Sequence, residues 1–131
     1  MAIIKKAGRQ HVASAEVIIT AAGLVSGQAY HAIDTLQGTE IIGGEVVVVT
    51  PFNSATTDVI DIGAGATGSR YLNDGNIHAA GRVPLVPTGY RHAGGEPITV
   101  TWVGTGAAPT AGEVRLVIQY IEQDREHFTI G

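Results

Sequence analysis

The strongest structural signal in this sequence is an alternation of apolar and polar residues with a period of two. Within residues 97–103, Ile98, Val100 and Trp102 fall on one face of an extended segment and threonines fall on the other. Residues 113–122 alternate in the same way. Successive side chains point to opposite faces in a β-strand. No segment shows a sustained 3.6-residue period, so we expect a chain built from strands.

Turn-forming residues break the chain into short pieces. Eighteen of the 131 residues are glycine, about twice the usual ~7%. The pattern predicts seven or eight short strands joined by tight turns, with one turn at Asn73–Asn76. We therefore expect an all-β fold, an antiparallel β-sandwich or jelly-roll-like single domain. The domain should span residues 14–131, with residues 1–13 as an N-terminal arm or edge strand.

The core should come from the apolar faces of these strands. The run EVVVVT at residues 45–50 contains four consecutive valines, which favours a strand buried on both faces. We expect the following side chains to be buried: Val47, Val49, Ile60, Val100, Trp102, Leu116, Ile118 and Tyr120.

Composition and charge exclude several classes of protein. The chain has no cysteine, which rules out thiolate metal sites and disulfide scaffolds. The net charge of −4 gives no basis for holding a nucleic-acid backbone, and no apolar run is long enough for a membrane-spanning helix. Only 15% of the residues are charged, against ~25% in an average domain. We therefore expect much of the surface to be covered in an oligomer or a larger assembly.

One glycine motif invites a functional interpretation. Residues 63–68 match G-x-G-x-x-G and follow the apparent strand Asp58–Ile62. In a dinucleotide-binding fold, a helix follows such a motif and an acidic residue lies ~20 residues further on. Here Asn73-Asp74-Gly75 interrupts any helix, and the expected acid is absent. We therefore interpret the motif as a connection between strands and expect no cofactor.

Other chemistry-bearing residues are scattered. The five histidines, His11, His31, His78, His92 and His127, show no metal-ligand spacing, which favours solvated or locally hydrogen-bonded loop histidines. Counting residues leaves a Ser/His/Asp triad open, but the chain has no G-x-S-x-G elbow. We expect no enzymatic activity.

A series of short motifs between residues 43 and 120 carries a resemblance to a known class of proteins. The motifs are T-P-F-N-S (50–54), D-V-I-D-I-G (58–63), S-R-Y-L-N (69–73), P-T-G-Y (87–90), I-T-V-T-W (98–102) and A-A-P-T-A-G-E-V-R-L-V-I-Q-Y (107–120). This pattern resembles small β-rich virion proteins of tailed bacteriophages, which are commonly encoded near the major capsid protein.

The resemblance implies a head decoration (cement) protein. Such proteins bind the outside of the mature capsid lattice, usually as trimers, and reinforce it against internal DNA pressure. The expected partners are the major capsid protein and further copies of the chain, in a trimer or a dimer. The expected location is the outer capsid surface of the virion, after synthesis in the host cytoplasm. A chain without cysteine suits that reducing compartment, because it needs no disulfide.

The basic, partly apolar arm is the first candidate for a capsid or subunit contact. Its apolar pair could enter a groove, and its basic residues could meet acidic groups of the shell. The contact residues we predict are Ile3, Ile4, Lys5, Lys6 and Arg9.

Two other functions remain open at this stage. A phage tail or fibre protein, or a receptor-binding or carbohydrate-binding module, would expose Tyr71, Tyr90, Trp102 or His92 on a loop surface. A small hydrolase would need a pocket with converging polar groups and a tight Ser–His or Asp–Asp pair.

Overall fold

A computed structural model describes residues 11–122 of the chain, and every regular element in that range is a strand. The absence of helix in these residues confirms the all-β prediction. The described residues therefore contain no helix long and apolar enough to cross a membrane. The eight strands are β1 (Ala13–Thr20), β2 (Ala29–Ile33), β3 (Thr39–Thr50), β4 (Thr57–Ala64), β5 (Thr67–Asn76), β6 (Gly81–Pro84), β7 (Ile98–Thr105) and β8 (Glu113–Glu122).

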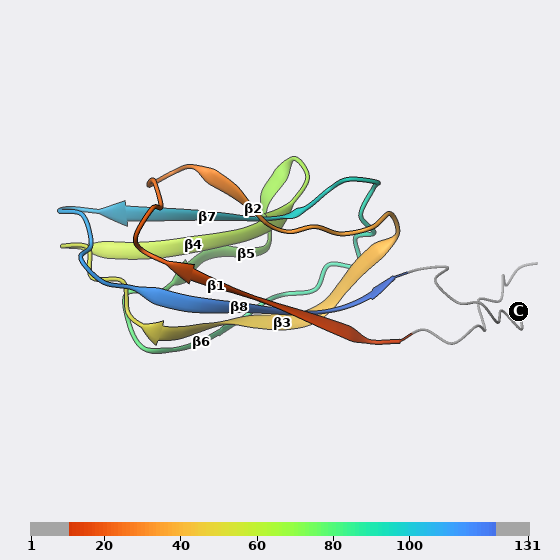
Figure 1. Ribbon diagram of the computed structural model, residues 1–131, viewed down its shortest axis with the longest axis horizontal. Coiled ribbons are helices and arrows are strands. Elements are labelled where there is room, and N and C mark those ends of the chain that lie inside the picture. Colours follow the sequence, from red (N-terminus) through yellow and green to blue (C-terminus); the bar gives the residue numbers. More distant parts are fainter. Residues whose placement is uncertain (1–10, 123–131) are drawn as a thin grey trace, which may run out of the picture.

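The strands form two antiparallel four-stranded sheets that pack face to face (Figure 1). One sheet has the order β1-β8-β3-β6 and the other has the order β2-β7-β4-β5. The pairing is nested, because β1 pairs with β8, β2 with β7, β3 with β6 and β4 with β5. The fold is therefore the predicted antiparallel β-sandwich, and the nested pairing is compatible with a jelly-roll winding.

The core lies between the two sheets and is made of inward-facing apolar side chains. Five of the predicted core residues are buried, namely Ile60, Val100, Trp102, Leu116 and Ile118. Burying a side chain of this size removes its apolar surface from water and contributes ~1.5–3 kcal/mol.

The prediction for the valine run was wrong. Val46 and Val48 are buried, whereas Val49 is 49% exposed and Val47 is only partly buried. The run is thus buried on one face, not on both. The register explains the choice of face, because Val46 lies opposite the buried Leu116 in β8. Tyr120, also predicted as core, is partly buried and packs against the core cluster.

The predicted turn at Asn73–Asn76 is also wrong. These residues lie inside β5, which continues to Asn76. Asp74 has a φ of 54° and the pairing of β4 with β5 shifts register nearby, so the turn-forming residues make a bulge in a strand.

The two long sides of the sandwich are built differently. On the β5/β6 side, the segment after β6 bridges the two sheets. The amide of Leu85 donates to Gly44 of β3, and the amide of Val86 donates to Tyr71 of β5. The other long side, which we call the β1/β2 side, consists of β1, the 21–28 connection and β2. Among the described residues, no segment pairs with the outer edge of either strand there.

Candidate functional site

The contact residues predicted from the sequence, Ile3, Ile4, Lys5, Lys6 and Arg9, lie outside the described residues. The described part of the chain does show where the arm joins the sandwich. Ala13, the first residue of β1, lies opposite Tyr120 near the end of β8. Both strands therefore reach the same end of the sandwich (Figure 1).

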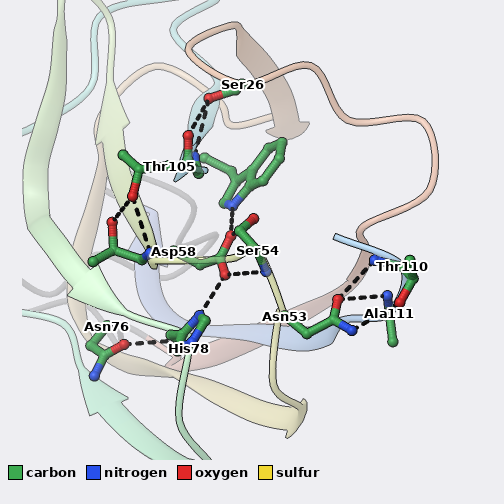
Figure 2. A network of polar contacts seen from close by, with 12 residues as sticks. Ser26, Asn53, Ser54, Asp58, Asn76, His78, Thr105, Thr110 and Ala111 are labelled. Carbon is green, nitrogen blue, oxygen red and sulfur yellow. Dashed lines mark hydrogen bonds and ion pairs between the residues drawn. The ribbon is translucent and has the colours of Figure 1, made fainter. Parts of the chain in front are cut away.

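The opposite end of the sandwich contains a buried polar network centred on Asp58 of β4. Its carboxylate is completely buried and accepts four hydrogen bonds. Ser54 donates from its hydroxyl (2.6 Å) and from its backbone amide (3.0 Å). Trp102 Nε1 donates at 2.9 Å, and His78 Nδ1 lies 2.8 Å from the second carboxylate oxygen. Figure 2 shows Ser54 and His78 pointing toward the carboxylate of Asp58.

The four donors decide the protonation state of Asp58. Burial alone would raise its pKa, but the hydrogen bonds from Ser54, His78 and Trp102 outweigh burial and lower the pKa below the ordinary value. The carboxylate is therefore ionised near neutral pH and can only accept hydrogen bonds. It follows that the Nδ1 atom of His78 carries the proton in this contact.

This arrangement differs from a nucleophilic triad. In a Ser–His–Asp triad, the histidine lies between the other two residues and removes the proton of the serine hydroxyl. Here Asp58 lies in the middle and accepts hydrogen bonds from both Ser54 and His78. A carboxylate with a lowered pKa is a poor base near neutral pH, and Ser54 is itself buried. The network therefore fixes loops and does not activate a nucleophile.

The loops around the network are cross-linked by further polar contacts (Figure 2). Asn53 accepts hydrogen bonds from the backbone amides of Thr110 and Ala111 at 2.8 and 2.9 Å. Ser26 accepts from the amide of Gly104 at 3.1 Å. These bonds tie the β3–β4 connection to the β7–β8 connection, and the β1–β2 connection to the end of β7.

A pocket of about 290 Å³ lies beside this network, and Ser54 and Trp102 are part of its wall. The other lining residues are small or apolar except for Ser26. The hydroxyl of Ser54 donates its proton to Asp58, so it has no proton left to donate to a ligand.

The sequence contained a signal for this network that was missed. Asp58 has the same parity as Ile60 and Ile62 along β4, and both isoleucines are completely buried. An acid on the inward face of a strand must be paired or hydrogen-bonded. The partners Ser54, His78 and Trp102 come from other segments, so the alternation alone could not identify them.

A second polar cluster lies around His92, near the other end of the sandwich. His92 is buried, with Nε2 2.8 Å from the hydroxyl of Tyr71 and Nδ1 2.8 Å from the hydroxyl of Thr35. The backbone carbonyl of Glu96 lies 3.1 Å from Nδ1, and the side chain of Glu96 accepts from the hydroxyl of Tyr90. Burial lowers the pKa of His92, so the ring is neutral at pH 7. Burial also raises the pKa of Tyr71 to about 12.

These positions contradict an aromatic binding surface. Tyr71, Trp102 and His92, three of the four residues that such a surface would expose, are buried. Tyr90 is half-buried, and the guanidinium of Arg70 lies 3.6 Å from the centre of its ring. His92 was also predicted as a solvated or locally hydrogen-bonded loop residue. It is instead buried, and its partners Thr35 and Tyr71 lie 57 and 21 residues away in the sequence.

The remaining sequence motifs have structural roles. The G-x-G-x-x-G segment forms the end of β4, a turn and the start of β5, so no helix follows it. A Cβ on Gly63 would lie 2.2 Å from the carbonyl oxygen of Thr67, so this glycine permits the close approach of two strands. Among residues 11–122, no group of three or more His, Asp and Glu side chains could hold a metal ion.

Comparison with known proteins finds similarity at the level of structure. No protein-family model and no curated protein matches the chain. A chain in the capsid asymmetric unit of cyanophage Pam1 matches with a TM-score of 0.70 and 16% identity, over 93% of this chain and 91% of that one. A chain in the acid-stable capsid of Helicobacter pylori bacteriophage KHP30 matches with a TM-score of 0.61 and 14% identity, over 86% of both chains. A chain in the capsid of Ralstonia phage GP4 matches with a TM-score of 0.58 and 12% identity, over 93% and 90%. At these identities, the similarity establishes a shared fold.

Proposed function

We propose that this chain is a structural protein of a bacteriophage virion, and that it acts as a head decoration (cement) protein. The observation that carries the proposal is the end-to-end likeness to chains of three phage capsids. Each likeness covers most of both chains, so the matched chains are about as long as this one. A small chain of this kind is suited to a role as a decoration subunit.

The site geometry supports a non-enzymatic role. The most chemistry-bearing cluster, Ser54, Asp58 and His78, is a buried hydrogen-bond network around an ionised acid. Its donors are all engaged with Asp58, which suits a rigid structural part. A stable sandwich with locked loops can carry load without changing shape.

The partners in this proposal are the major capsid protein and further copies of the chain. The oligomer is a trimer, with a dimer as the alternative, and it sits on the outer surface of the head after synthesis in the host cytoplasm. The arm residues Ile3, Ile4, Lys5, Lys6 and Arg9 are the proposed contact with the shell. Many copies on one lattice bind with avidity, so each contact can be weak. No nucleic acid, membrane or cofactor takes part.

The test is binding to heads assembled in the absence of this chain. The purified protein should co-sediment with such heads, saturate at a fixed number of copies per head, and raise the temperature at which the heads release their DNA. Competition by excess unlabelled protein should reverse the binding. If the intact protein fails to bind heads, the decoration proposal is wrong.

A tail, fibre or receptor-binding role is the alternative that such a failure would favour. Immunogold labelling of intact virions with an antibody against the chain separates the two locations. Label over heads supports decoration, and label confined to tails contradicts it. The carbohydrate-binding version of the alternative gains no support from the described residues, because its aromatic candidates are largely buried.

A further inference from the structure

The strand β1 is an edge without the features that usually block edge pairing. It pairs with β8 through eight consecutive residues with no shift in register, and no described strand pairs with its other side. Edge strands are usually shortened, bulged, or guarded by lysine or proline. At the opposite edge of the same sheet, β6 has four residues and includes Arg82 and Pro84. β1 carries a single charge, Glu16, whose carboxylate lies 3.4 Å from Arg115 of its own chain.

The core is incompletely covered on the same side of the sandwich. This is the β1/β2 side. Nine partly buried apolar residues pack against the core, and most of them lie on this side. They are Ala15, Val17, Ile19, Ala21, Leu24, Ala32 and Ile33. On the β5/β6 side, by contrast, the bridging Leu85 is buried. The β1/β2 side therefore leaves core side chains partly in contact with water.

Exposed apolar side chains extend this surface. Ile18 on the outer face of β1 is 61% exposed, and Val25 in the 21–28 connection is 57% exposed. No Asp, Glu, Lys or Arg occurs between Glu16 and Asp34, and no longer uncharged stretch exists in the chain. Monomeric proteins rarely leave exposed apolar side chains next to an unpaired strand edge.

We propose that the β1/β2 side is the contact between copies of this chain. Charge selects this occupant. Each copy carries a net charge of −4, so contact between copies is least opposed where charge is sparse, and the only charged side chain of this side is Glu16. A partner recognised by its charge would find only Glu16 here, and that residue is already paired with Arg115.

The dimensions of the surface fit a stable contact. Eight extended residues span roughly 27 Å at ~3.4 Å per residue. A standard interface buries ~800 Å² on each partner, which corresponds to a compact patch roughly 30 Å across. Pairing of the free backbone groups of β1 with a second copy would add hydrogen bonds to the apolar contact. This inference adds a location to the homo-oligomer of the proposed function and concerns the free protein, so it can fail while binding to heads succeeds.

The experiment is the mass of the protein in solution, measured by sedimentation equilibrium over a wide concentration range. The test variant is the double substitution Ile18→Lys and Val25→Lys, which places charge on the β1/β2 side at two exposed positions. The matched control is Val86→Lys, because Val86 is 65% exposed and lies on the β5/β6 side. The wild type should be oligomeric, the double variant should raise the dissociation constant at least ~100-fold, and the control should match the wild type.

Three outcomes would overturn the proposal: a wild type that is monomeric throughout, a double variant with unchanged mass, or a control that dissociates equally. A double variant that keeps its mass but loses head binding would identify the shell as the occupant instead. Hydrogen exchange of the wild type gives a reading that does not depend on the variants folding. Amides of residues 13–33 should gain protection as concentration rises, and protection gained only elsewhere contradicts the proposal.

Discussion

Trp102 Nε1 donates a 2.9 Å hydrogen bond to the carboxylate of Asp58, and this contact joins β7 to the start of β4 inside the sandwich. It is one of four donors to a carboxylate that has no exposure to water. A buried charge is costly unless its hydrogen bonds are complete. The end of the sandwich therefore depends on a single acid.

Replacing Asp58 with Ala should lower the free energy of unfolding by ~3–5 kcal/mol, because the indole of Trp102 and the hydroxyl of Ser54 lose their buried acceptor. Asp58→Asn keeps the shape and one acceptor oxygen, so its loss should be smaller. Urea unfolding followed by Trp102 fluorescence measures both. The control is Asp34→Ala at an exposed loop position, which should change stability by no more than ~0.5 kcal/mol. Equal effects at the two positions would contradict a structural role for the network.

Mild acid should destabilise the fold through His92. Burial lowers the pKa of His92 in the folded state, so below the unfolded pKa of ~6.5 the unfolded chain binds more protons than the folded chain. Stability should therefore fall as pH drops from about 7.5 to about 5.5. Protonation removes the acceptor at Nε2, which takes the hydrogen bond from the hydroxyl of Tyr71, whereas Nδ1 can donate to the carbonyl of Glu96 in either state.

The measurement is urea unfolding of wild type and His92→Gln across this pH range. The variant should be less stable at pH 7, but its stability should depend less on pH than that of the wild type. The slope of stability against pH, not the absolute stability, tests the prediction, because the two proteins differ only at position 92. Parallel curves for the two proteins would show that His92 does not cause the acid sensitivity.

Gly104 should not tolerate a side chain. A Cβ at this position would lie 2.5 Å from the indole of Trp102 and 2.7 Å from the hydroxyl of Ser54. Gly104→Ala should therefore cost ~1–3 kcal/mol by overpacking the network. Gly68→Ala is the matched control, since a Cβ there meets nothing within 4 Å. Thermal unfolding of the two variants gives the comparison, and a neutral Gly104→Ala would mean that the network can shift to make room.

The sequence predicted the strands better than it predicted which faces are buried and where the bulges lie. β7 and β8 were found because their alternation has a clear phase, as with Leu116 and Ile118. The valine run does not alternate between apolar and polar residues, so its sequence does not show which face is buried. Its pairing with β8 decides that Val48 points inward and Val49 outward.

The candidate site was harder to predict for a related reason. Asp74 and its neighbours have the composition of a turn, but a β-bulge uses the same backbone freedom, and pairing with β4 selects the bulge. Likewise, two partners of Asp58, His78 and Trp102, lie 20 and 44 residues away along the chain. Local patterns carry no information about contacts of that separation.

The N-terminal segment should contribute to binding of heads. Deleting residues 1–12 keeps all eight strands, so the truncated protein should still fold. We expect it to bind heads more weakly, because it loses the apolar pair Ile3 and Ile4 and three basic residues. Co-sedimentation with heads assembled without this chain measures the difference.

Salt separates the charged part of this contact from the apolar part. Raising ionic strength from about 0.1 M to about 1 M shortens the screening length from ~10 Å to ~3 Å, which weakens attraction between Lys5, Lys6 and Arg9 and acidic groups of the shell. Binding by the full chain should therefore fall with salt, and binding by the truncated chain should change less. A variant with glutamine at these three positions should behave like the full chain at high salt. Full-strength binding by the truncated chain at both ionic strengths would reject the arm as the anchor and direct attention to the described surface of the sandwich.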